Sequence, residues 1–96
     1  MTAKERFAAN LVYERKRAGL SQDDLAFYSG IHHSHISRFE RATILGSFES
    51  LTKLAGSLEI SPAALMAGIT WKPNGKVKGG LLEVEPFDKQ ASDPDQ

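Results

Sequence analysis

The sequence predicts a small all-α domain, and three observations support this fold class. Residues 19–41 contain two short amphipathic segments, each with helix-capping residues, joined at a glycine. Apolar residues recur at helical spacing between positions 51 and 58. A Ser-Pro pair at positions 61 and 62 is a typical helix start. A chain of 96 residues has room for one such domain.

The first three helices are expected before residue 42. A helix over residues 3–17 has Phe7 and Leu11 on one side and ends before Gly19. Ser21 and Asp24 form the pattern of a capping box, so the second helix begins at residue 22 and stops at Gly30. The third helix has two apolar residues, Ile36 and Phe39, on its buried side. Its outer side carries His33, Ser34, Ser37 and Arg38.

Two more helices are expected after a loop over residues 43–46. Ser47 caps the fourth helix, whose apolar residues are Leu51, Leu54, Ala55 and Leu58. Proline lacks an amide hydrogen, which costs nothing at the first position of a helix, so Ser61 and Pro62 begin a short fifth helix. Gly68 can end this segment.

The remaining chain differs from the helical part. We expect a helical domain over residues 1–69, an extension over residues 70–85 and an acidic, disordered tail over residues 86–96. Leu81, Leu82 and Val84 form one short extended run, so the extension can add one strand. This strand could pair with its copy in a second subunit, lie along the helices or stay disordered, since a single strand is unstable alone.

Charge and composition exclude several classes of protein. The net charge is zero, but residues 1–80 have a net charge of +4 and residues 81–96 a net charge of −4, so the helical part is mildly basic. There is no cysteine for disulfides or thiolate metal sites, which is compatible with a reducing cytoplasm, where we expect the protein. The N-terminal segment lacks the apolar run of a signal peptide, and no segment is apolar enough to cross a bilayer.

The segment over residues 19–41 resembles the helix-turn-helix of the phage repressor and Cro-like (xenobiotic response element) family. The resemblance covers about residues 4–69, because Phe7, Leu11 and Arg15 match the family's first helix and the apolar residues after position 50 match its last two. This family usually has a glycine after Glu-Arg, where this chain has Ala42. The motif residues that carry the resemblance are Leu20, Ser21, Gln22, Leu25, Ala26, Gly30, Ile31, Ile36, Ser37 and Glu40.

The resemblance implies a five-helix, lambda-repressor-like domain that binds double-stranded DNA. Such a transcriptional regulator reads the major groove with its third helix, as a homodimer on a two-fold operator. The family pattern makes His33, Ser34, Ser37 and Arg38 the candidates for base reading. It makes Gln22, His32, Arg41 and Thr43 the candidates for phosphate binding. It also implies a largely buried structural ion pair between Arg15 and Glu40.

Other functions have less support. The same fold serves as a protein-interaction module in antitoxins and adaptors, so a protein partner is the main alternative. His32 and His35 lie one helical turn apart, but two imidazoles do not complete a zinc site, so we expect no bound metal. The sequence lacks a glycine-rich phosphate loop and a nucleophile motif, so we expect no catalytic residues, no cofactor and no small-molecule substrate.

Overall fold

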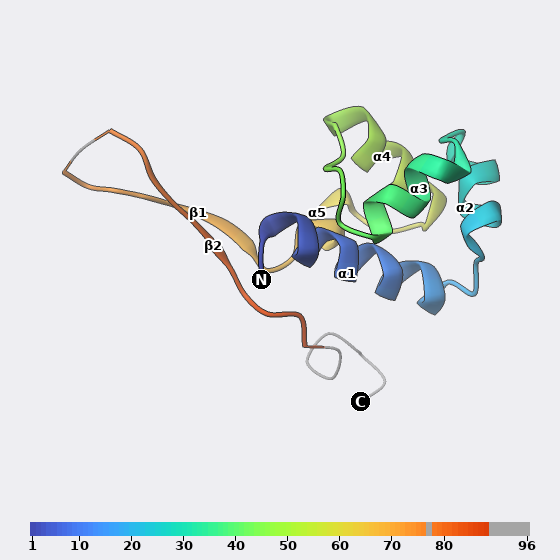
Figure 1. Cartoon of the computed structure of the whole chain (residues 1–96), viewed down its shortest axis with the longest axis horizontal. Helices are drawn as coiled ribbons and strands as arrows, with labels where there is room; N and C mark the ends of the chain where they lie inside the picture. The colour runs from blue at the N-terminus through green and yellow to red at the C-terminus, as the bar shows by residue number, and fades with distance from the viewer. Residues whose placement is uncertain (77, 89–96) are drawn as a thin grey trace.

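The computed structural model describes residues 1–76 and 78–88. Five helices and a two-stranded antiparallel sheet make up these described residues, and the strands extend away from the helices (Figure 1). The chain contains, in order, α1 (Ala3–Arg17), α2 (Gln22–Ser29), α3 (His33–Glu40), α4 (Phe48–Ser57), α5 (Pro62–Leu65), β1 (Ile69–Pro73) and β2 (Gly80–Val84).

The helices begin at the capping residues that the sequence indicated. Ser21 and Asp24 form a full capping box at the start of α2, and Ser47 accepts from the amide of Ser50 at the start of α4. Thr2 and Glu5 form a second capping box, at the start of α1. These bonds satisfy amides that have no partner within the helix.

Three helices end in the same local structure, with a left-handed residue after the cap. After α1 this residue is Gly19, with φ +74°, and the amide of Leu20 bonds to the carbonyl of Arg15. After α3 it is Ala42, with φ +60°, and the amide of Thr43 bonds to the carbonyl of Arg38. After α4 it is Glu59, with φ +57°. Ala42 therefore adopts the backbone conformation that glycine favours.

The hydrophobic core joins all five helices of the described chain. Phe7 and Phe39 pack edge to face, with ring centroids 6.0 Å apart, so α1 and α3 are in direct contact. The core holds α3 by one side and leaves its other side at the surface. The buried core residues are Phe7, Leu11, Leu25, Ile36, Phe39, Leu54, Ala55, Leu58 and Leu65.

The C-terminal extension differs from the prediction of a single added strand. Residues 69–73 form a second strand, so the expected strand pairs within its own chain, with Ile69 opposite Val84 and Trp71 opposite Leu82. Sequence analysis missed β1 because Pro73 and the glycines after it suggested only a loop. Yet Ile69, Thr70 and Trp71 are residue types that favour strands.

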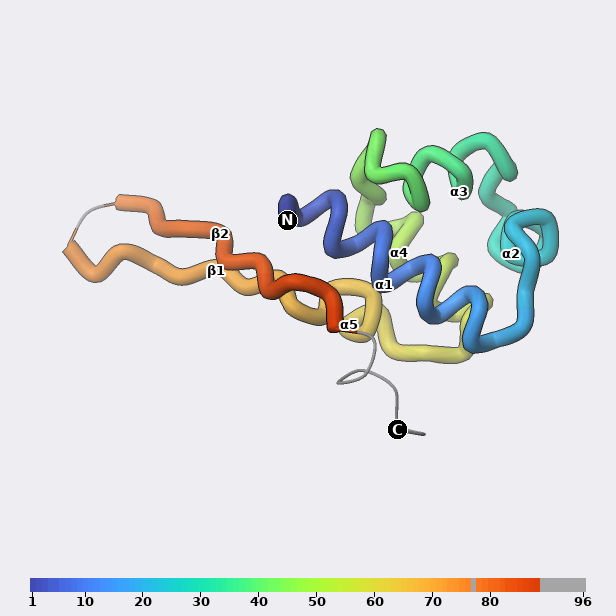
Figure 2. Tube along the Cα trace, turned by 60° about the horizontal axis from the view of Figure 1, so that its bottom comes forward, coloured from blue at the N-terminus to red at the C-terminus, as the bar shows by residue number. Residues whose placement is uncertain are grey.

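Buried polar contacts fasten this hairpin to the helices at its base. The guanidinium of Arg6 donates to Asn10 Oδ1 at 3.1 Å and to the backbone carbonyl of Glu85 at 2.7 Å. Asn10 Nδ2 donates to the carbonyls of Leu65 and Ala67 at 3.0 and 2.9 Å. A β-carbon at Gly68 would lie 2.6 Å from Arg6 Cζ, and φ is +82° there, so any other residue would be strained and would displace this guanidinium. The rest of the hairpin extends away from the helices (Figure 2).

Two further expectations concern the chain ends and the membrane. The predicted disordered tail, residues 86–96, lies outside the described residues from position 89 onward. Within it, the rings of Phe87 and Tyr13 are in a tilted arrangement with centroids 5.6 Å apart, and Arg6 Cζ lies 5.3 Å from the centroid of the Phe87 ring. Among the described helices, none has the length and apolar character needed to span a membrane.

Candidate nucleic-acid interface

The corner between α2 and α3 sets the direction of α3. Gly30 ends α2 in the left-handed conformation, with φ +71°, and the hydroxyl of Ser29 accepts from the amide of Ile31 at 3.1 Å. Ile36 and Phe39 then bury one side of α3 in the core. The opposite side faces solvent along the length of the helix.

This opposite side carries the residues that we expected to read bases. His33, Ser34 and Arg38 are exposed, and Ser37 is half-buried beside them. Within the described chain, neither a hydrogen bond nor an ion pair engages the guanidinium of Arg38, so its donors are available. The outer side of α3 has no free carboxylate, because its one acidic residue, Glu40, is paired.

Two histidines at the start of α3 have neighbours that sequence analysis did not identify. His32 caps the helix, with Nδ1 accepting from the amide of Ser34 at 3.1 Å and lying 2.8 Å from its hydroxyl. His33 Nδ1 lies 3.4 Å from Asp23 Oδ1, an ion pair when the imidazole is protonated. His32 and Ser34 are therefore hydrogen-bonded to each other. The carboxylate of Asp23 lies beside His33, one of the candidates for base reading.

The other three candidates for phosphate binding lie at the ends of α2 and α3. Gln22 is at the first position of α2, and its amide donates to Glu40 Oε1 at 3.0 Å, which leaves one amide hydrogen free. Arg41 is exposed, with Nε 3.4 Å from the carbonyl of Ser37. The Thr43 hydroxyl donates to the carbonyl of Arg38 at 3.1 Å, so it can donate to a phosphate only by giving up that bond.

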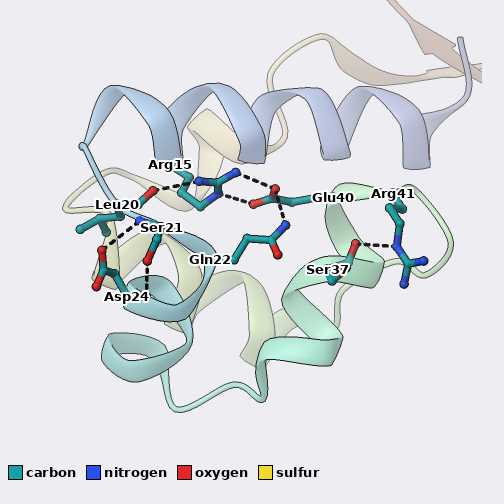
Figure 3. Close-up of polar contacts among 8 residues, drawn as sticks. All are labelled: Arg15, Leu20, Ser21, Gln22, Asp24, Ser37, Glu40 and Arg41. Carbon is teal, nitrogen blue, oxygen red and sulfur yellow. Dashed lines mark hydrogen bonds and ion pairs between the residues drawn. The ribbon is translucent and has the colours of Figure 1, made fainter.

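An ion pair between Arg15 and Glu40 lies behind this surface (Figure 3). Arg15 Nε and Nη2 donate to the two carboxylate oxygens at 2.6 and 2.9 Å, and Nη1 donates to the carbonyl of Leu20 at 2.9 Å. The side chains are only 13% and 6% exposed. The hydrogen bond to Glu40 raises the pKa of Arg15, against the opposing effect of burial.

With the Gln22 contact, this network connects three helices. Arg15 comes from α1, Gln22 from α2 and Glu40 from α3, so the position of α3 is fixed by paired charges as well as by the core. We did not expect the Gln22–Glu40 bond, because we considered Gln22 only for phosphate. A long polar side chain at the first position of a helix can point toward a bound phosphate or toward a neighbouring helix. The sequence alone does not show which of these two it contacts.

Metal binding gains no support from this geometry. Among residues 1–76 and 78–88, no three histidine, aspartate or glutamate side chains come together as metal ligands could. Both His32 and His33 already contact other side chains.

Comparison with known proteins gives a family match. A helix-turn-helix family model matches residues 11–65, more than half of the chain. No curated protein sequence matches the chain.

Several solved structures are similar to the chain over its helical part. The restriction-modification controller protein C.AhdI from Aeromonas hydrophila has 37% identity and a TM-score of 0.63, covering 65% of this chain and 94% of its own. The clp gene regulator ClgR from C. glutamicum has 26% identity and a TM-score of 0.64, covering 68% and 84%. The controller protein C.Esp1396I, solved as a tetramer with its natural 35 base-pair operator, has 25% identity and a TM-score of 0.62, covering 68% and 86%.

Proposed function

The chain belongs to the phage repressor and Cro-like helix-turn-helix family of DNA-binding regulators, and we propose that it reads specific duplex sequences with α3. It enters the major groove with the outer side of this helix. It acts in the cytoplasm, as a transcriptional regulator and without catalysis. All three of the similar proteins described above are named as controllers or gene regulators, and the structure of one of them contains its operator DNA.

The main observation behind the proposal is that α3 is fixed by the core and by an ion pair, while its polar side is exposed to solvent. The major groove admits one helix, whose exposed side chains reach the base edges. Arg38 has unengaged donors that match the two acceptors of guanine. His33, Ser34 and Ser37 lie beside it and can donate or accept. The Arg15–Glu40 pair holds this helix in one orientation, which base reading requires.

Phosphate contacts would flank this helix and set its register. The free amide hydrogen of Gln22 is available at the N-terminus of α2, where the helix dipole favours an anion. His32 and Arg41 are at the two ends of α3. Thr43 contributes least, since its hydroxyl proton is already donated. These contacts would strengthen binding to every sequence without distinguishing between sequences.

A two-fold operator follows from the small size of the reading surface. One domain offers a few base contacts, so useful specificity comes from two half-sites about 34 Å apart on one side of the duplex. We therefore propose that the chain binds DNA as a homodimer.

Gel-shift titration of two variants tests this assignment. Arg38→Ala should weaken specific binding by about 1 to 3 kcal/mol and relax the preference at one base pair, because it removes a bidentate base contact. Arg41→Ala should weaken specific and random duplexes equally, because a phosphate contact reads no sequence and this exposed side chain is outside the Arg15–Glu40–Gln22 network. If both variants lose specific and non-specific binding in the same proportion, the assignment of base and phosphate contacts is wrong.

A protein partner is the second candidate, and one observation favours it. Phe27 and Tyr28 on α2 are 82% and 63% exposed, and their rings pack against each other with centroids 5.5 Å apart. Exposed aromatic pairs are common anchors in protein interfaces. A module of the antitoxin or adaptor kind would use this pair, and Phe27→Ser would then abolish binding of its protein partner.

A further inference from the structure

A groove of about 810 Å³ lies between α1, the end of α3 and Phe87. Ala8, Ala9 and Val12 on α1 form its apolar lining, and Ala42 adds to this lining from the residues after α3. Because these side chains are short, they leave open space beside α1. A space of this size can hold a ligand or a few residues of a polypeptide chain.

Three basic side chains line the same groove. Lys16 and Arg17 are in the last turn of α1, Arg41 directly follows α3, and all three are exposed. Within the described chain, Lys16 makes no hydrogen bond or ion pair, and Arg17 has a long ion pair, with Nη1 4.0 Å from Glu14 Oε1. An exposed pair of this kind is weak, so both cations are available to an acidic partner.

Two carboxylates also line the groove, and both are already engaged. Glu5 Oε1 accepts from the amide of Thr2 at 2.8 Å, in the capping box of α1. Glu40 accepts from Arg15 and from Gln22. The groove therefore carries an excess of positive charge, which favours an acidic occupant.

The chain itself reaches this groove at Phe87. The ring of Phe87 is half-buried, lines the groove and lies near Tyr13, with ring centroids 5.6 Å apart. Arg6 Cζ is 5.3 Å from the centroid of the same ring, within the range of a cation–π contact. These contacts fix the position of the last described residues, so the chain that follows position 88 starts at the groove.

The residues after Phe87, here called the acidic segment (residues 88–96), have the charge that the groove requires. They include three aspartates and one lysine, which gives a net charge of −2. The segment contains no large apolar side chain, so a contact with the groove would be made mainly by its carboxylates.

The acidic segment is also long enough to reach the basic side chains. Asp93 is six residues after Phe87, and an extended chain of that length spans up to about 20 Å. Along α1, the rise from Tyr13 to Arg17 is only about 6 Å. A short tether gives an effective concentration of roughly millimolar, so even a weak contact is formed for much of the time.

We infer that the acidic segment occupies this groove in its own chain, with Asp93 and Asp95 beside Lys16, Arg17 and Arg41. This docking does not depend on the proposed function, but its consequence does. Arg41 is a candidate for phosphate binding, so the segment must leave Arg41 before a duplex can contact it. The segment therefore weakens binding to every duplex without changing the sequence that is preferred.

A spin label tests the docking without DNA. The sequence has no cysteine, so Ser92→Cys is a single attachment site for a nitroxide on the full chain. The label should broaden the amide resonances of Ala9 and Val12 more than that of Lys53, which is on α4 and does not line the groove. Equal broadening of these three resonances, or none, would overturn the inference.

Two charge-reversed variants of the labelled chain show whether the basic side chains hold the segment. Lys16→Glu with Arg17→Glu should abolish the selective broadening, because it removes the cations at the groove. Lys72→Glu with Lys76→Glu changes the net charge equally on the hairpin and should leave the broadening in place. The same broadening in both variants would contradict the assigned contact.

A mixed sample identifies which chain supplies the segment. It contains isotope-labelled chains without the nitroxide and unlabelled chains that carry it. Docking within one chain predicts little broadening in this mixture. Broadening as strong as that within a single chain would show that the segment comes from a second copy, and would overturn the inference.

Gel-shift titration with a random-sequence duplex tests the consequence. Asp93→Asn with Asp95→Asn should raise the affinity about threefold, the gain expected if the segment occupies the groove for about two-thirds of the time. Glu83→Gln with Glu85→Gln removes two exposed carboxylates from the hairpin and its end, and should raise the affinity less. Equal affinities of the two variants would overturn the effect on DNA.

Failure of the docking and failure of the proposed function give different results. A wild type that binds no duplex, together with selective broadening at the groove, would contradict the proposed function alone. DNA binding without selective broadening would contradict the docking alone. Circular dichroism checks that the variants keep their helices.

Discussion

The carboxylate of Glu40 accepts from Arg15 and from Gln22, so a single side chain connects α1, α2 and α3. Removing one partner of a largely buried ion pair leaves the other charge unpaired, and this usually costs several kcal/mol. The same substitution at an exposed pair has little effect, because solvent screens the charges.

Glu40→Gln should therefore lower the free energy of unfolding by about 3 kcal/mol, the low end for a buried pair. The effect is at the low end because Arg15 keeps its bond to Leu20 and is 13% exposed. Urea denaturation measures this change. The control is Glu49→Gln, which breaks the exposed pair with Lys53, where Nζ and Oε1 are 2.8 Å apart. Equal effects of the two substitutions would contradict a structural role for Glu40.

Ala42 gives a second prediction about a single residue. It has φ +60°, a conformation that costs a residue with a β-carbon about 1 to 2 kcal/mol. Ala42→Gly removes this cost but adds freedom to the unfolded chain, so a net gain in stability of about 0.5 to 1 kcal/mol is expected. Thermal unfolding measures it. Ala9→Gly, within α1, is the control and should destabilise by about 1 kcal/mol. Destabilisation by both would show that Ala42 is unstrained.

Sequence analysis identified single residues where the pattern is local. The spacing of Ile36 and Phe39 predicted the buried side of α3, and this is confirmed. The buried contacts of Arg6 and Asn10 were not predicted, because their partners are near the other end of the chain, as with Glu85. Asn10 lies on the buried side of α1, and a polar residue there was the one available signal.

The capping boxes at the starts of α1 and α2 each include a carboxylate that titrates in acid, Glu5 and Asp24. Hydrogen bonds from the amide and hydroxyl of Ser21 lower the pKa of Asp24, and those of Thr2 lower the pKa of Glu5. A carboxylate whose pKa is lowered on folding stabilises the fold above its unfolded pKa. This contribution is lost as the pH falls through the lowered, folded-state pKa.

The melting temperature should therefore decrease between about pH 5 and pH 2, and part of that decrease should disappear in Asp24→Asn. Glu59→Gln is the control, since it removes an exposed carboxylate that makes no hydrogen bond or ion pair within the described chain. Melting followed by circular dichroism at several pH values measures both variants. An unchanged pH dependence in Asp24→Asn would show that its carboxylate does not stabilise α2.

Helix starts and stops were predictable because each depends on a few neighbouring residues. Ser47 and Pro62 are examples, and the structure confirms helices at both places. The hairpin of β1 and β2 was predicted only in part, since strand pairing depends on residues that are distant in sequence. Gly80 pairs with Pro73, and Val84 pairs with Ile69. The sequence between the two strands indicated a loop, but it did not indicate that residues 69–73 pair with residues 80–84.

The charges of the whole molecule are distributed in a way that favours DNA on one side. Residues 1–80 have a net charge of +4, whereas residues 81–96 have a net charge of −4. Glu83, the one acidic residue of β2, lies on the β1–β2 hairpin, which extends away from the helices (Figure 1). In the proposed complex, the outer side of α3 would therefore meet the duplex without strong opposing charge from the β1–β2 hairpin. This arrangement also explains how a chain of zero net charge could bind a polyanion.

Selection of bound sequences from a random duplex library tests the central claim most directly, with the wild type and Arg38→Ala compared side by side. The account predicts an enriched sequence of two inverted half-sites with centres about 34 Å apart. It also predicts that Arg38→Ala loses the preference at one position in each half-site. No enriched sequence from the wild type, or the same sequence from both proteins, would contradict reading of DNA by the outer side of α3.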